Sequence, residues 1–137
     1  MRRAKAVVFH SLDQALAAMR AAEALGVPLT LMSGPGAAGY AGPAWFAEVL
    51  RQARAQYPTV KTAAILDCAQ APGRALGALR HGVKRIRLAG NALARARVVA
   101  IAKARGAVLD GARYELLDLN GARNPERAAR EFLESKP

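Results

Sequence analysis

The sequence is poor in cysteine, in aromatic residues and in acidic residues. Cys68 is the one cysteine among 137 residues, which excludes an intrachain disulfide and makes a reducing cytoplasm the expected compartment. Aromatic residues are only 5% of the chain although hydrophobic residues are 53%, so the expected core is built mainly of Ala, Leu and Val. Asp and Glu number 10 against 21 Lys and Arg, and the resulting net charge of +11 favours anionic partners.

The sequence also has no apolar run as long as a membrane-spanning helix, so no membrane partner is expected. The apolar stretch after the basic start ends at His10, which is too short for a signal peptide. The length fits a single α/β domain over residues 1–137.

Short apolar segments alternate with longer amphipathic ones along the chain. Strands are predicted over 4–9, 27–32, 60–66, 83–88, 107–109 and 114–118. Helices are predicted over 12–25, 44–56, 72–80, 92–104 and from 124–126 to about 134. Ser11 with Gln14 forms a capping box, Asn91 is a good N-cap, and Gly26 ends the first helix. This alternation predicts a parallel sheet of five or six strands, either half-TIM-barrel-like or an open flavodoxin-like sheet.

Ligands bind parallel α/β sheets at the carboxyl ends of the strands, so the residues there are the site candidates. They are His10, Ser11, Ser33 with the glycine-rich loop 33–43, Asp67, Cys68, Gly90, Asn91 and Asp110. The segment Gly34–Gly39 matches the G-x-G-x-x-G pattern, but it follows the second strand and Pro35 removes an amide donor. It therefore predicts contact of Ser33, Gly34 and Gly36 with a small anion, or a plain connection, and no dinucleotide or other cofactor.

Asp67 and Cys68 end the third strand. The aspartate can serve as a catalytic proton shuttle or can cap the next helix. The cysteine can contact a ligand, but the sequence favours a small buried hydrophobic residue there.

Arg85 and Arg87 alternate with apolar residues on the fourth strand, where a strand covered on both faces would be continuously apolar. The strand face that carries these arginines is a solvated edge, an interface with a partner, or a surface that contacts an anion. If Asp67 lies on the same face of the sheet, it could pair with Arg87. In the following helix the expected buried stripe is Leu93, Val98, Val99, Ile101 and Ala102.

Five segments, in this order, resemble class II (metal-dependent) fructose-bisphosphate aldolases over about residues 6–111. The segments are Phe9–Ala17, Val27–Gly42, Tyr57–Cys68, Ala78–Asn91 and Val98–Gly106. They resemble the family's first strand–helix turn, its serine–glycine loop ending in Tyr-Ala-Gly, its third and fourth strands, and the helix that follows. The resemblance implies the first half of a (β/α)₈ barrel that cleaves ketose bisphosphates with a divalent metal.

The resemblance assigns proton transfer to Asp67, but other positions depart from the family pattern. Cys68 stands in place of a metal-binding histidine, His10 in place of an asparagine, and Ala89 in place of an aspartate. We therefore expect no metal site and no class II aldolase activity. The predicted function is binding of a small anionic, phosphorylated metabolite. The predicted ligand-binding residues are His10, Ser33, Gly34, Gly36, Cys68, Arg85, Arg87 and Asn91.

Two alternatives stay open. One is a lyase or aldolase-type enzyme whose site is completed in a homo-oligomer. The other is a basic module that binds nucleic acid or an acidic protein. Nucleic acid is the less favoured partner, because charge alone supports it and no recognised nucleic-acid-binding motif is present.

Overall fold

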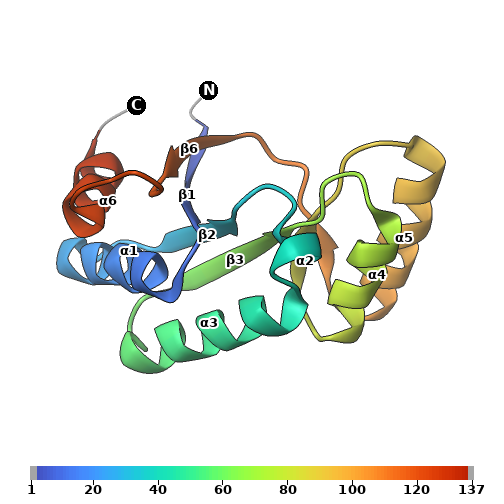
Figure 1. Cartoon of the computed structure of the whole chain (residues 1–137), viewed down its shortest axis with the longest axis horizontal. Coiled ribbons are helices and arrows are strands. Elements are labelled where there is room, and N and C mark those ends of the chain that lie inside the picture. The colour runs from blue at the N-terminus through green and yellow to red at the C-terminus, as the bar shows by residue number, and fades with distance from the viewer. Residues whose placement is uncertain (1–2, 136–137) are drawn as a thin grey trace. The chain divides into compact units, whose positions relative to one another are not determined.

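A computed structural model describes residues 3–135 and has an α/β fold with a parallel sheet, which confirms the predicted fold class (Figure 1). The strand order is β5-β4-β3-β2-β1-β6. The strands are β1 (Ala4–Phe9), β2 (Leu29–Ser33), β3 (Thr62–Asp67), β4 (Arg85–Arg87), β5 (Val108–Leu109) and β6 (Tyr114–Asp118). The helices are α1 (Leu12–Leu25), α2 (Ala37–Tyr40), α3 (Pro43–Gln56), α4 (Pro72–Arg80), α5 (Ala92–Ala104) and α6 (Pro125–Glu134). The first five strands are neighbours in chain order, as in a barrel, whereas a flavodoxin-like sheet has the order 2-1-3-4-5.

The chain divides into two compact units. Unit 1 contains residues 1–32, 49–64 and 113–137, and unit 2 contains residues 33–48 and 65–112. A single domain over 1–137 stays a prediction.

Helix boundaries follow the capping residues that the sequence predicts. Ser11 Oγ accepts a hydrogen bond from the Gln14 amide, and Gly26 ends α1 in the left-handed conformation with φ 66°. Asn91 Oδ1 accepts from two amides at the start of α5. Asn124 caps α6, whose first residue is Pro125.

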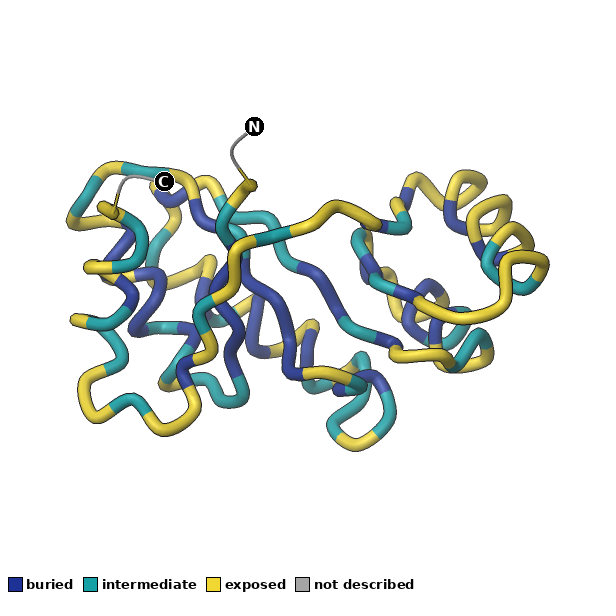
Figure 2. The backbone as a smooth tube through the Cα atoms, turned by 90° about the horizontal axis from the view of Figure 1, so that it is seen from above, coloured by how far each residue is buried: buried dark blue, intermediate teal, exposed yellow. Residues whose placement is uncertain are grey.

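In unit 1, the core lies between strand β1 and helix α1. The residues of β1 from Ala6 to Phe9 are buried, as is the alanine-rich face of α1, and Figure 2 shows this burial along the chain. Strand β6 pairs in parallel with β1, with Val7 opposite Leu117. Helix α6 follows β6 and packs beside α1 (Figure 1).

In unit 2, β3 and β5 flank β4 in parallel ladders. Leu66 and Ile86 lie opposite each other and are fully buried. Helices α4 and α5 pack beside each other, and Leu79 and Val98 are their largest fully or almost fully buried side chains.

Three local predictions need correction. The segment 33–43 is not a continuous loop, because the short helix α2 interrupts it. The fourth strand is three residues long rather than six. In α5 only Val98 and Ala102 of the expected stripe are buried, because residues four apart form one narrow contact line. The other three members of the expected stripe are exposed: Leu93 by 65%, Val99 by 45% and Ile101 by 41%.

Within residues 3–135, every helix is too short or too polar to cross a membrane.

Candidate functional site

The loop after β2 is fixed to the end of β3 in unit 2. Ser33 is buried, and its Oγ accepts a hydrogen bond of 2.9 Å from the Asp67 amide. Gly36 adopts φ 70°, and its amide donates to Asp67 Oδ1 at 2.9 Å. The glycine is needed here because a residue with a side chain is strained in this left-handed conformation.

Asp67 Oδ1 also accepts a hydrogen bond from the Ala69 amide at 2.9 Å. One carboxylate oxygen therefore connects the loop after β2 with the loop after β3. The interpretation of Asp67 as a helix cap is wrong, because α4 begins after Ala71, which makes no side-chain capping bond. Ala69 itself has φ 50°, an uncommon and strained value for a residue other than glycine. Such strain is often found at functional sites.

Cys68 is 1% exposed, and its thiol donates a hydrogen bond of 3.7 Å to the Leu66 carbonyl. Burial, with a smaller contribution from the Asp67 charge, raises the pKa of this thiol to about 12. The thiol therefore stays protonated near neutral pH, where only a thiolate would be a good nucleophile or metal ligand. This supports the interpretation of Cys68 as a small buried hydrophobic residue.

Strand β4 brings two arginines to the same region of unit 2. Arg87 lies opposite Asp67 in the ladder, and its Nη2 donates to the Ala112 carbonyl at 2.5 Å. Arg85 Nη1 lies 2.9 Å from Asp110 Oδ2, and Asp110 is only 6% exposed. Asp110, rather than Asp67, thus supplies a carboxylate partner for this strand.

Backbone bonds hold these loops together. The Cys68 amide donates to the Arg87 carbonyl, and the Ala89 amide donates to the Ala69 carbonyl, each at 2.8 Å. We call the assembled region the strand-end rim. It comprises Ser33–Gly36, Asp67–Ala69, Arg85, Arg87 and Asp110.

Asn91 and His10 are also predicted site residues. Asn91 uses its side-chain oxygen to cap α5, and it lies in unit 2 with the rim. His10 belongs to unit 1, where it is part of a hydrogen-bonded cluster.

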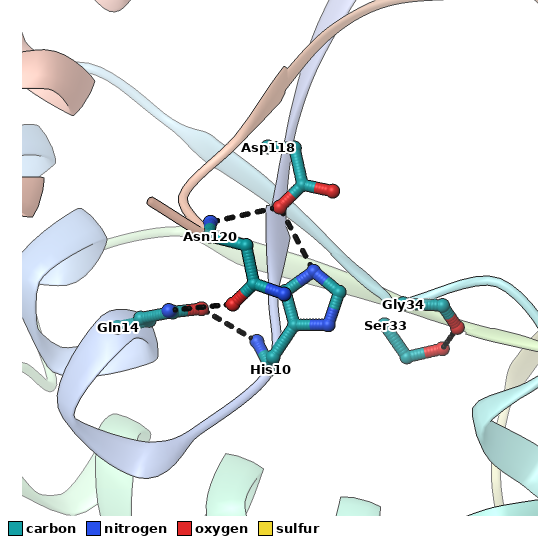
Figure 3. Close-up of polar contacts among 6 residues, drawn as sticks. All are labelled: His10, Gln14, Ser33, Gly34, Asp118 and Asn120. Atoms are coloured by element: carbon teal, nitrogen blue, oxygen red, sulfur yellow. Dashed lines mark hydrogen bonds and ion pairs between the residues drawn. The ribbon is translucent and has the colours of Figure 1, made fainter. Parts of the chain in front are cut away.

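In that cluster, His10 Nε2 lies 2.8 Å from Asp118 Oδ1, at the end of β6 (Figure 3). Gln14 Oε1 accepts from the His10 amide at 2.7 Å, and Gln14 Nε2 donates to Asn120 Oδ1 at 3.1 Å. Neither Asp118 nor Asn120 is among the site residues predicted from the sequence. The available signal is that Asp118 is a carboxylate at the last position of a predicted strand.

The aldolase resemblance implies a divalent metal, and the residues present do not fit one. Cys68 takes the position of a metal-binding histidine, yet its thiol is buried with a raised pKa. In addition, residues 3–135 contain no group of three or more His, Cys, Asp or Glu side chains placed to hold a metal ion.

Two solved structures resemble this chain. The putative fructose-1,6-biphosphate aldolase of Coccidioides immitis has a TM-score of 0.62 and 27% identity, over 78% of this chain and 40% of that one. The probable tagatose 6 phosphate kinase of Sinorhizobium meliloti 1021 has a TM-score of 0.59 and 18% identity, over 96% of this chain and 45% of that one. The chain thus spans less than half the length of either protein.

No family model and no curated protein matches the sequence. The structural likeness supports an aldolase-like α/β fold.

Proposed function

We propose that this chain binds a small anionic, phosphorylated metabolite at the strand-end rim of unit 2 and does not perform class II aldolase cleavage. The observation that carries the proposal is the rim itself, where hydrogen bonds hold the Ser33–Gly36 loop, Asp67 and β4 together. Both structural neighbours have names that refer to sugar phosphates, which favours this ligand class.

The charge of unit 2 supports an anionic ligand. This unit contains nine Lys and Arg residues and three Asp and Glu residues. Asp110 is already engaged by Arg85, and Asp67 Oδ1 is engaged by two amides. The remaining positive field favours binding of an anion, and a guanidinium is well suited to phosphate.

Each part of the rim has a role in this proposal. Arg87 contributes positive charge, and the Ser33–Gly36 loop contributes a turn with little side-chain bulk, in which Asp67 holds the Gly36 amide. Asp67 fixes the two loops, and its carboxylate can accept a hydrogen bond from a ligand hydroxyl or exchange a proton with it. Cys68 contributes a buried side chain within the rim.

The binding proposal is tested by thermal melting with and without inorganic phosphate and fructose 1,6-bisphosphate. We expect both ligands to raise the melting temperature of the parent protein, because a ligand that binds only the folded state stabilises it. Arg87→Gln should lose this rise. Arg97→Gln is the matched control, because it removes the same charge from an exposed position on α5 of the same unit.

An equal response in both variants would show that the effect of phosphate depends on overall charge, and the rim would then not be the binding site. Sedimentation of the same samples covers the alternative in which this face joins two copies of the chain. In that case Arg87→Gln would change the sedimentation coefficient.

The absence of aldolase activity is tested by incubating the protein with Zn²⁺ and fructose 1,6-bisphosphate and measuring triose phosphate formation. We expect no turnover above buffer, since Cys68 replaces a histidine ligand and stays protonated. Turnover that a chelator abolishes would contradict this part of the proposal.

A further inference from the structure

His10 and Asp118 meet where two paired strands of unit 1 end. Strands β1 and β6 run in parallel, with Val8 opposite Asp118, and the Leu119 amide donates to the Val8 carbonyl. His10 follows β1 directly, so its imidazole reaches the Asp118 carboxylate from the neighbouring strand. The two residues are separated by 108 positions in the sequence and are brought together by the β1–β6 ladder.

The chemistry of this pair fixes the state of the imidazole. An ionised carboxylate only accepts hydrogen bonds, so the hydrogen of neutral His10 must lie on Nε2, which is 2.8 Å from Asp118 Oδ1. The other ring nitrogen, Nδ1, then carries a lone pair. A histidine oriented by a carboxylate in this way is suited to accept a proton, because the carboxylate stabilises the imidazolium that forms.

Gln14 and Asn120 hold the pair in place, as Figure 3 shows. The Asn120 backbone amide donates to the same Asp118 oxygen at 2.9 Å, which restrains the carboxylate. Gln14 accepts from the His10 backbone and donates to the Asn120 side chain, and it thereby connects the start of α1 with the end of β6. The His10 side chain is 22% exposed, so small molecules can reach it while the protein restricts its orientation.

We propose that His10 and Asp118 form a proton-accepting dyad, in which His10 Nδ1 takes a proton from a water molecule or from a hydroxyl group of a small ligand. In this step the O–H bond breaks, its electron pair stays on the oxygen, and the proton forms a new bond to Nδ1. The imidazolium keeps its Nε2–H hydrogen bond to Asp118. His10 is the reacting group, and Asp118, Gln14 and Asn120 are positioning residues.

The second histidine of the chain provides an internal control. His81 caps the end of α4 in unit 2, and its Nδ1 lies 2.9 Å from the Gly77 carbonyl. A carbonyl also requires a hydrogen on the nitrogen that faces it, but it carries no charge to stabilise an imidazolium. The dyad therefore predicts that His10, and not the more exposed His81, is the reactive base.

The first experiment determines the tautomer by ¹⁵N NMR of the two imidazoles in the full chain. We expect His10 to be in the Nε2–H form in the parent protein and in a mixture of forms in Asp118→Ala, while the His81 signals stay unchanged. A purely structural contact would not require this change. An Nδ1–H form of His10 in the parent protein would overturn the proposal.

The second experiment measures hydrolysis of p-nitrophenyl acetate, with which an accessible neutral imidazole reacts as a base or nucleophile. We expect His10→Asn to remove most of the protein-dependent rate and His81→Asn to keep it. Asp118→Ala should lower the rate about tenfold, which is less than the roughly 10²–10⁴-fold that a positioned general base contributes, because His10 itself stays present. A normal solvent deuterium isotope effect is expected for proton transfer.

Circular dichroism of each variant confirms that it is folded before its rate is interpreted. Gln14→Leu is the second positioning variant, and it should lower the rate while leaving His10 present. An unchanged rate in both His10→Asn and Asp118→Ala would overturn the dyad. None of these measurements involves the rim residues of unit 2, so their outcome is independent of phosphate binding.

Discussion

The two units differ in how they hold their positive charges. In unit 1, three arginines meet carboxylates: Arg20 and Arg130 both contact Glu126, and Arg127 contacts Glu131. In unit 2, several cations meet neutral carbonyl groups of the backbone. These contacts join Arg95 to Leu88, Lys84 to Arg105 and Arg105 to Leu79.

A carbonyl satisfies the donors of a cation but does not neutralise its charge. Unit 2 can therefore be well hydrogen-bonded and still present a positive field, which is the property that an anion-binding region needs. Unit 1 cancels more of its charge and instead places an imidazole against a carboxylate. In this protein, therefore, a cation can have its N–H donors hydrogen-bonded while its positive charge is not neutralised by a carboxylate.

The largest expected effect comes from comparing two of the carboxylates that pair with arginines, Asp110 and Glu126. Asp110→Ala should lower the free energy of unfolding by about 2–3 kcal/mol, because it leaves Arg85 without its buried partner. Glu126→Ala in unit 1 should cost less than about 1 kcal/mol, because its arginines are largely exposed. Urea denaturation followed by circular dichroism measures both, and equal costs would contradict the distinction.

The next comparison uses the aspartates that end a strand in each unit. Asp67→Ala should cost about 2 kcal/mol, because one carboxylate oxygen accepts from the Gly36 and Ala69 amides in a half-buried position. Asp118→Ala should cost less than about 1 kcal/mol, since its side chain is 51% exposed. Asp67→Asn should recover part of the loss, which urea denaturation would also detect.

A third prediction concerns alkaline pH. Burial raises the Cys68 pKa from its ordinary value of 9.0 to about 12 in the folded protein, so the unfolded chain loses this proton first. Stability from this group is complete below pH 9 and is lost as the pH rises from about 9 towards 12. By pH 10 the parent protein should have lost about 1 kcal/mol more than Cys68→Ala, measured relative to each protein at pH 8. Parallel pH profiles for the two proteins would contradict the assignment.

The smallest expected effect tests the strained turn of the rim. Ala69→Gly should stabilise the protein by about 0.5–1 kcal/mol, because glycine adopts φ 50° without the steric cost that alanine has. Gly26→Ala should have the opposite sign, since Gly26 occupies φ 66° at the end of α1 in unit 1. Thermal melting of the two variants measures both shifts, and a destabilised Ala69→Gly protein would show that the turn is not strained.

Local signals predicted much of this fold because they act over a few residues. Ser11 and Asn91 cap helices as expected, and the strand–helix alternation correctly indicates a parallel sheet. The partner of β6 could not be predicted, because the choice of a strand's neighbour depends on contacts between distant parts of the chain.

The site was harder to predict for the same reason. The sequence indicated that Arg85 and Arg87 share a face. It did not indicate that Asp110, which follows β5, would pair with Arg85 on the neighbouring strand β4. It indicated His10 without Asp118, since the two meet only after β6 joins β1. In α5, alanines occur around the whole helix, so the pattern alone could not distinguish buried Val98 from exposed Val99.

The pairing of β6 with β1 has a consequence for the order in which the molecule is made. Ala4 lies opposite Tyr114, so the ribosome must add about 110 residues after β1 before β6 exists to cover its outer edge. During that interval an almost wholly apolar strand has an unpaired side, which is a hazard for aggregation in the nascent chain. Lys5 is the one charged residue in β1, and a charge within an apolar strand opposes aggregation while the strand is unpaired. In the folded protein, Lys5 Nζ donates to the Phe132 carbonyl of α6.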